Sequence, residues 1–190
     1  MPMCHGHPHL RSFIVLPIFT ILLGWFGLAP TAPAASDLGQ FPAIHARSLD
    51  GVHLNLPAKF CGRISLVVIS FAREQQKEVK SWIPAAQNIE AGHGNFCYYE
   101  LLVMSRENLL YRLWLNGSLR SNTTDKELRS RILTAYVNKG SFRHYLHIAN
   151  EKRVVAVLVD REGRVYWRAD GAYADRDTPA IVSALAANGS

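Results

Sequence analysis

The pattern of apolar and polar positions divides the chain into alternating strands and helices. A continuous apolar run, Ile64 to Phe71, is bounded by Gly62 and by charged residues, which predicts a strand covered on both faces. Tyr98 to Met104 is a second such run. Between them, apolar residues recur every three or four positions and predict a helix with one buried stripe, formed by Val79, Trp82, Ile83, Ala86 and Ile89. Because Pro84 falls inside this pattern, we expect the helix to kink or restart there.

The segments on either side of these elements give weaker patterns. Phe41 opens a short extended segment, and Val52 to Leu56 alternates apolar and polar residues as a half-buried strand does. Thr124 to Glu127 fits a capping box, in which a hydroxyl and a glutamate satisfy each other's backbone donors. We expect the helix that follows to bury Leu128, Ile132 and Tyr136 and to stop near Gly140. Two shorter segments are expected as an amphipathic helix, 107–115, and a turn of undefined type, 142–148.

The last third of the chain predicts a hairpin and a final helix. Val154 to Val159 and Arg164 to Ala169 are strands joined by the turn Asp160 to Gly163, where Asp bonds the turn backbone and Gly supplies positive φ. Asp177 begins a helix that packs Ile181, Val182 and Leu185 inward. The whole order predicts an α/β, thioredoxin-like sandwich over residues 41–188, with a central mixed sheet containing parallel strands, a closing β-hairpin and a C-terminal helix.

The first thirty-five residues are expected to be a signal peptide rather than part of the fold. Arg11 precedes an apolar run from Phe13 to Leu28, and Ala32-Pro33-Ala34 follows it as an A-x-A cleavage pattern. The alternative is an uncleaved anchor. Residues 36–40 form a short linker. We therefore expect an exported protein, either periplasmic or anchored to the inner membrane and facing the periplasm.

The net charge of the chain is +6, and its basic residues are scattered. This distribution favours a solvated surface and argues against a nucleic-acid partner, which would need a concentrated basic block. Peripheral attraction to anionic lipid head groups stays open.

The turn after the central strand is where a sheet of this kind usually carries its chemistry. A thiol oxidoreductase would place a cysteine pair there, at the helix N-terminus. This chain has Ala72, Arg73 and Glu74 instead. Cys61 and Cys97 each lie just before a predicted strand, so the two could be neighbours; they form either a disulfide or two separate buried thiols.

Several segments together resemble the mitochondrial ATPase-complex (ATP synthase) assembly factor family and its bacterial relatives. They are the strand Leu66 to Phe71, the Ser81-Trp82 pair, the segment Phe142 to Asn150, and the hairpin Val157 to Arg168 with Asp170-Gly171. The resemblance implies a thioredoxin-like fold used as a binding module without redox chemistry. It also implies a membrane-embedded subunit of ATP synthase as the family's partner.

Four residues are candidates for partner binding. Arg73 stands where the thiol would be and could grip a carboxylate or a lipid phosphate. Arg164, Tyr166 and Arg168 are expected to share the outer face of the hairpin, with Trp167 turned toward the core. His144 and His147 lack a third ligand nearby, so no metal and no cofactor is expected.

The sequence thus predicts an exported, redox-inactive binding or assembly module at the membrane face, with a protein partner and no enzymatic activity. A thiol-dependent oxidoreductase or peroxidase using Cys97 or Cys61 is the first alternative. A metal carrier is the second.

Overall fold

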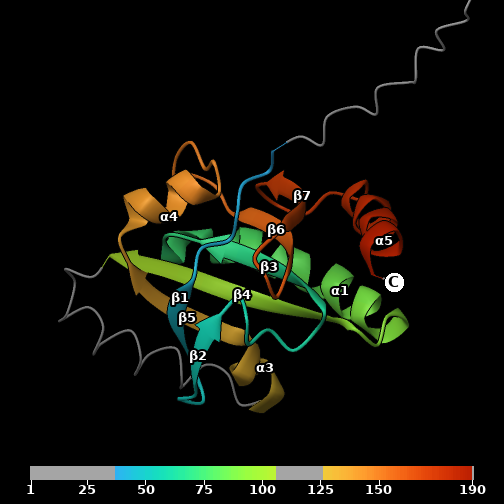
Figure 1. Ribbon diagram of the computed structural model, residues 1–190, viewed down its shortest axis with the longest axis horizontal. Helices are drawn as coiled ribbons and strands as arrows, with labels where there is room; N and C mark the ends of the chain where they lie inside the picture. Colours follow the sequence, from blue (N-terminus) through green and yellow to red (C-terminus); the bar gives the residue numbers. More distant parts are fainter. Residues whose placement is uncertain (1–36, 106–125, 190) are drawn as a thin grey trace, which may run out of the picture. The chain divides into compact units, whose positions relative to one another are not determined.

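The computed structural model describes residues 37–105 and 126–189, which lie within one compact unit, Ser36–Ser190. Its secondary-structure elements fall into a seven-stranded mixed sheet and the helices that cover it (Figure 1). The strands are β1 (Ile44–Ser48), β2 (His53–Leu56), β3 (Ile64–Ser70), β4 (Phe96–Ser105), β5 (Ile132–Val137), β6 (Val155–Asp160) and β7 (Val165–Asp170). The helices are η1 (Arg73–Gln75), α1 (Gln76–Gly92), α3 (Lys126–Arg131), α4 (Lys139–Tyr145) and α5 (Asp177–Asn188).

The sheet has the strand order β2-β1-β5-β4-β3-β6-β7. Strands β3, β4 and β5 run parallel, and β6 and β7 close one side as an antiparallel hairpin. Every residue of β3 is buried, as expected for a strand covered on both faces. The predicted thioredoxin-like sandwich, with its mixed sheet, closing hairpin and final helix, is confirmed.

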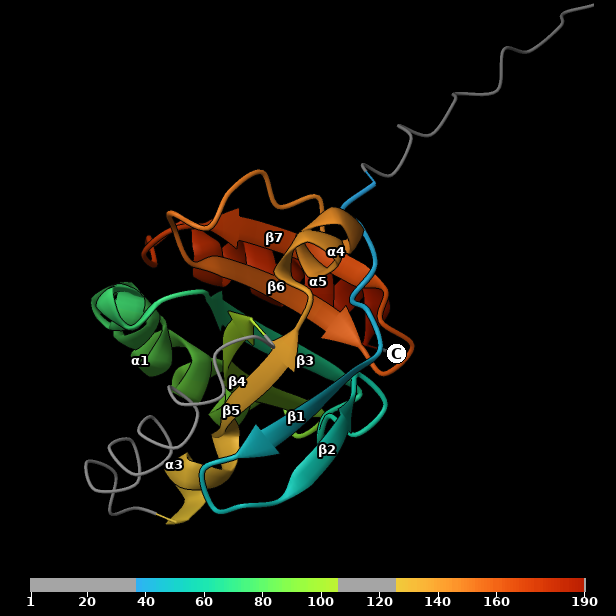
Figure 2. The ribbon, with the colours of Figure 1, turned by 90° about the vertical axis from the view of Figure 1, so that its left-hand side faces the viewer.

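Two apolar layers enclose the sheet. On one face, α1 and α5 pack Val79, Trp82, Ile181 and Leu185 onto the sheet. On the other, α4 contributes Phe142 to the core. Figure 2 shows α1 and α4 on opposite sides of the strands. Because both faces of β3 are covered and both its edges pair with strands, further segments of the chain can approach β3 only at its two ends.

The helix expected from residue 124 to Gly140 is wrong in its second half. Helix α3 ends at Arg131, and β5 occupies Ile132–Val137, between β1 and β4. The apolar spacing of four that suggested a helix, from Leu128 to Ile132 to Tyr136, is also a multiple of the strand period of two. A strand forms here because Ile132–Val137 contains β-branched and aromatic residues and because the edge of β4 is available for pairing.

Other boundaries also differ from the prediction. Strand β1 was expected only as extended chain, and residues 142–148 contain most of α4 rather than an undefined turn. Helix α1 runs through Pro84 without a restart. The 107–115 segment and the side chains of the capping box lie outside the described residues.

The hairpin turn has the predicted construction. The Asp160 Oδ1 atom accepts hydrogen bonds from the backbone N–H of Glu162 at 3.0 Å and of Arg164 at 2.8 Å. Gly163 has φ +87°, and a Cβ there would stand 2.6 Å from the Phe41 carbonyl oxygen. Glycine is therefore required both for the turn and for the passage of the chain at Phe41.

Candidate functional site

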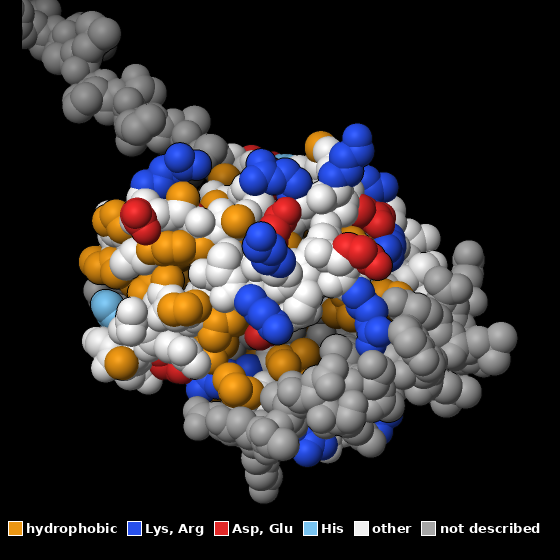
Figure 3. Space-filling model, turned by 180° about the vertical axis from the view of Figure 1, so that it is seen from behind, with side chains coloured by type: hydrophobic (Ala, Val, Ile, Leu, Met, Phe, Trp, Pro, Cys, Tyr) orange, Lys and Arg blue, Asp and Glu red, His pale blue; other side chains and the backbone are white. Residues whose placement is uncertain are grey.

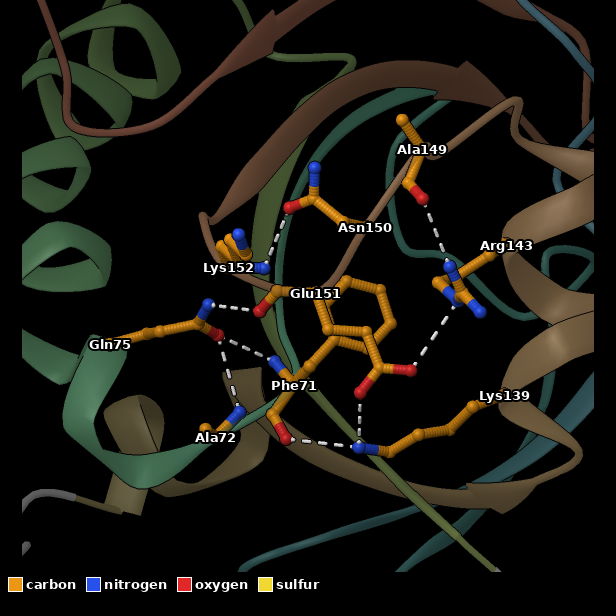
Figure 4. Close-up of polar contacts among 9 residues, drawn as sticks. All are labelled: Phe71, Ala72, Gln75, Lys139, Arg143, Ala149, Asn150, Glu151 and Lys152. Atoms are coloured by element: carbon orange, nitrogen blue, oxygen red, sulfur yellow. Dashed lines mark hydrogen bonds and ion pairs between the residues drawn. The ribbon is translucent and has the colours of Figure 1, made fainter.

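The carboxyl end of β3 opens into η1 and carries no thiol. Phe71 to Glu74 contains no Cys, Ser or Thr. Phe71 is buried, whereas Arg73 is half-buried and begins η1. A polar cluster of side chains from three segments holds this turn (Figure 4).

Gln75 is the centre of that cluster. Its side-chain Oε1 accepts hydrogen bonds from the backbone N–H of Phe71 at 2.7 Å and of Ala72 at 3.2 Å. Its Nε2 donates to the Glu151 carbonyl at 2.8 Å. Gln75 is only 7% exposed, so its amide replaces water for three backbone groups.

The carboxylate of Glu151 joins the loop before β6 to α4. Lys139 Nζ lies 2.8 Å from Glu151 Oε2 and also donates to the Phe71 carbonyl at 3.2 Å. Arg143 Nε lies 3.4 Å from Glu151 Oε1. Figure 4 shows these side chains converging from η1, α4 and the loop. The arrangement fixes three segments to one another and contains no thiol or hydroxyl.

Sequence reasoning missed Gln75, Lys139 and Glu151. Gln75 stands among polar residues at a helix start, Lys139 was expected at the end of the preceding helix rather than at the start of α4, and no structure was predicted for Glu151. No pattern in the sequence indicates that they meet.

The hairpin residues do not form the expected stripe. A register irregularity between Leu158 and Val159 lets Tyr166 pack, with Trp167, against the core beneath α1 and α5. The Tyr166 hydroxyl donates to Asp160 Oδ2 at 2.8 Å. The shared face predicted for Tyr166 and Arg168 is therefore wrong, because the irregularity shifts the alternation of the strand by one residue.

Arg168 is held by its own domain. Its Nε donates to Asp170 Oδ1 at 2.9 Å, and its Nη1 donates to the carbonyls of Leu146 at 2.7 Å and His147 at 3.1 Å. These bonds tie β7 to the end of α4. Arg164, by contrast, is exposed.

Cys61 and Cys97 lie at the opposite end of the sheet. Cys61 precedes β3, Cys97 is the second residue of β4, and the two are joined by a disulfide with a Cα–Cα distance of 6.1 Å. The Cys61 N–H donates to the Tyr99 hydroxyl at 3.0 Å. Burial raises the pKa of Tyr99, so this phenol stays protonated at neutral pH.

No group of three or more metal-ligating side chains occurs within 37–105 and 126–189. His144 is in α4, whereas His147 lies beyond its end with φ +51°, so the two do not share a helical face. In the same residues, no helix is both long and apolar enough to cross a bilayer.

Figure 3 shows the face on which α1 lies. Hydrophobic side chains gather on its left, where α5 lies, and Lys and Arg side chains are spread over the rest, with fewer acidic ones among them. This spread agrees with the scattered basic residues of the sequence. On this face the basic side chains form no continuous block.

The fold and the thiol-free turn define a thioredoxin-like protein without a cysteine pair at the usual position. Among solved structures, the chain is similar to BsSco, a member of the Sco family of cytochrome c oxidase assembly proteins. The identity is 16% and the TM-score 0.53, over 78% of this chain and 94% of that one. It is similar to yeast Sco1 at 13% identity and TM-score 0.54, over 78% and 96% of the two chains. Copper-bound ScoI of Arabidopsis thaliana has 10% identity and TM-score 0.52, over 79% and 99%.

The family is shown by a match over most of the chain. Residues 36–187 match the model of the ATP10 protein family, and the chain belongs to this family. The predicted resemblance to ATP synthase assembly factors is thereby confirmed. No curated protein matches the chain significantly.

Proposed function

We propose that this chain is an exported, non-redox thioredoxin-like protein that acts as an assembly module at the membrane face, and that its partner belongs to the ATP synthase complex. The observation that carries the proposal is the turn after β3. There Gln75 and Lys139 hold the backbone by hydrogen bonds, and Glu151 pairs with Lys139, at the place where a redox protein would keep its thiols. Membership in the ATP10 protein family supports the partner class.

The two alternatives have less support. A thiol oxidoreductase or peroxidase needs a reactive thiolate, and Cys61 and Cys97 are bonded to each other away from any helix N-terminus. A metal carrier needs a ligand set, and the described residues contain none of three or more ligands.

The partner-binding surface that we propose lies at the carboxyl end of β3. Arg73 stands at the turn. The loop before β6 is bonded to this turn by Gln75, through the Glu151 carbonyl, and it carries the exposed Lys152 and Arg153. Positive side chains around a rigid turn suit a partner segment that presents carboxylates or lipid phosphates. Arg164 is a second candidate contact, because it is exposed; Tyr166 and Arg168 are kept as weaker ones, because both already bond within the domain.

Affinity capture from solubilised membranes tests the partner. The protein lacking residues 1–35 should recover membrane subunits of ATP synthase, and Arg73→Glu should recover several-fold less. Arg47→Glu is the matched control, because Arg47 is an exposed arginine on β1. Recovery of no ATP synthase subunit, or equal losses in both variants, would count against the proposal.

A turnover assay tests the absence of redox catalysis. We expect no repeated turnover in insulin reduction or in peroxide consumption. Activity that disappears in Cys97→Ser would replace the assembly proposal by the thiol-enzyme alternative. Fractionation of the expressing cells tests export, and recovery of the full-length chain in the cytoplasm alone would contradict it.

A further inference from the structure

The disulfide joins two cysteines with different surroundings. Cys61 is exposed, whereas Cys97 is half-buried in β4 and packs against the apolar cluster on the α4 face. A thiolate arriving from solvent therefore meets Cys61 first. Attack on one sulfur releases the other, so Cys97 is the leaving group of such an exchange.

A buried hydroxyl lies on the strand next to that of the leaving group. Ser65 is 0% exposed, and its Oγ has no hydrogen-bond partner among the residues that the structure describes. Ser65 is the register partner of Cys97 on the neighbouring parallel strand, so the two side chains project from the same face of the sheet. An unsatisfied buried hydroxyl is unusual, because leaving a donor unpaired is costly. A sulfur that is free of the disulfide could accept the Ser65 O–H bond.

The loop that carries Cys61 is also held by bonds other than the disulfide. Arg161 Nε donates to the carbonyls of Phe60 at 3.0 Å and Gly62 at 3.2 Å, and its Nη2 donates to the Cys61 carbonyl at 2.9 Å. The Tyr99 hydroxyl holds the Cys61 N–H. These four bonds are independent of the redox state, so the two thiols would remain neighbours after reduction and could pair again.

We propose that Cys61–Cys97 is a reversible thiol-exchange site for a dithiol reductant, in which Cys61 is attacked and Cys97 leaves beside Ser65. One thiolate of the reductant bonds to Cys61 Sγ, the Cys61–Cys97 bond breaks, and the electron pair goes to Cys97 Sγ, where the Ser65 hydroxyl stabilises it. The second thiolate of the reductant then attacks the mixed disulfide and releases Cys61. The protein gains two electrons and two protons as two thiols, and the reductant becomes a disulfide. This is a single exchange. It leaves the protein without thiol catalysis, which is the sense of non-redox in the proposed function, and it does not depend on the proposed assembly function.

Equilibration against mixtures of reduced and oxidised dithiothreitol tests the role of Ser65. The reduced fraction of the protein lacking residues 1–35 is counted by maleimide mass tagging. We expect reversible reduction with a retained fold, seen in the amide NMR spectrum. Loss of one hydrogen bond in Ser65→Ala should shift the equilibrium toward the disulfide by about fivefold. Ser70→Ala is the matched control, because Ser70 is a buried serine of the same strand on its other face.

Two outcomes overturn the proposal. One is loss of the folded spectrum on reduction in the unmodified protein. The other is the same equilibrium for Ser65→Ala as for Ser70→Ala. The order of attack has its own measurement, because a monothiol such as glutathione leaves an adduct that peptide mapping can assign. We expect the adduct on Cys61, and an adduct mainly on Cys97 would contradict the assigned leaving group.

Discussion

The two ends of the central strand β3 are held by different chemistry. At the carboxyl end, hydrogen bonds and ion pairs of Gln75, Lys139 and Glu151 fasten the turn. At the amino end, a covalent bond joins the loop before β3 to β4, and Arg161 holds the same loop through its carbonyls. Open α/β sheets usually carry reactive groups at the carboxyl end. In the part of that end that the structure describes there is no thiol, and Cys61 and Cys97 lie at the other end.

This contrast shows that a thioredoxin-like fold can hold the turn after β3 with polar side chains and without a thiol. The polar cluster at the carboxyl end satisfies the backbone groups of the turn and leaves Arg73 on a fixed support. The disulfide end acts on the stability of the sheet. We therefore expect substitutions at the two ends to affect different properties, and the following measurements rank the effects.

Removal of the disulfide should have the largest effect on stability. The bond closes a loop of 36 residues, for which the chain-entropy model gives about 4 kcal/mol. The variant with both Cys61→Ala and Cys97→Ala should lose most of this amount in urea unfolding while keeping its partner affinity. A loss of affinity equal to that of Arg73→Glu would abolish the distinction between the two ends.

Gln75→Ala should cost about 3 kcal/mol, because it leaves two buried or half-buried N–H groups and one carbonyl without their partner. Unlike the disulfide variant, it should also weaken partner capture, since the turn that supports Arg73 loosens. Gln76→Ala is the control, because Gln76 is exposed and makes one bond, of 3.3 Å, to Glu100. Equal losses for the two variants would refute the central place of Gln75.

Tyr99→Phe should cost about 1 kcal/mol through the lost bond to the Cys61 N–H. The loss should be larger in the reduced protein, where this bond and Arg161 alone hold the loop. Tyr98→Phe, on the opposite face of β4, removes only a 3.4 Å contact with Gln87 and serves as the comparison. Thermal unfolding with and without reductant measures both variants.

Glu100→Gln should have the smallest effect, and one that depends on pH. Burial raises the pKa of Glu100 above its usual value, although the Gln76 amide and Lys80 lower it in part. The folded protein then holds this proton more tightly than the unfolded chain, so stability falls as pH rises above the usual carboxyl pKa toward the folded value. The variant should raise the melting temperature at pH 7 and leave it nearly unchanged at pH 4. A gain that is equal at both pH values would contradict this cause.

The parts of the fold that could be predicted from the sequence are those whose residue pattern fits only one type of secondary structure. Ile64 to Phe71 and the hairpin around Asp160 and Gly163 were found because continuous apolar runs and turn residues mark them directly. Strand β5 was missed because a spacing of four fits both periods, and its place between β1 and β4 is decided by tertiary contacts.

Only one property of the candidate site could be predicted from the sequence, namely the absence of a thiol at the turn after β3. The lack of a thiol at Phe71 to Glu74 is visible in the sequence. The partners Gln75, Lys139 and Glu151 come from three separate segments, and only the folded chain brings them together. The hairpin stripe failed because one extra residue in β7 reverses the faces beyond it.

The strand order also determines when the parts of the domain can fold. Strand β1 pairs with β2 beside it in sequence, but its other neighbour is β5, with Ala46 opposite Ala135. The β1–β2 hairpin can form early, yet it has no edge to join until β5 has settled on β4. Contacts between such distant residues carry a large loop-closure entropy and slow folding. The first strands of this domain are therefore among the last to be incorporated, and a chain interrupted before residue 137 would leave the hairpin without its place in the sheet.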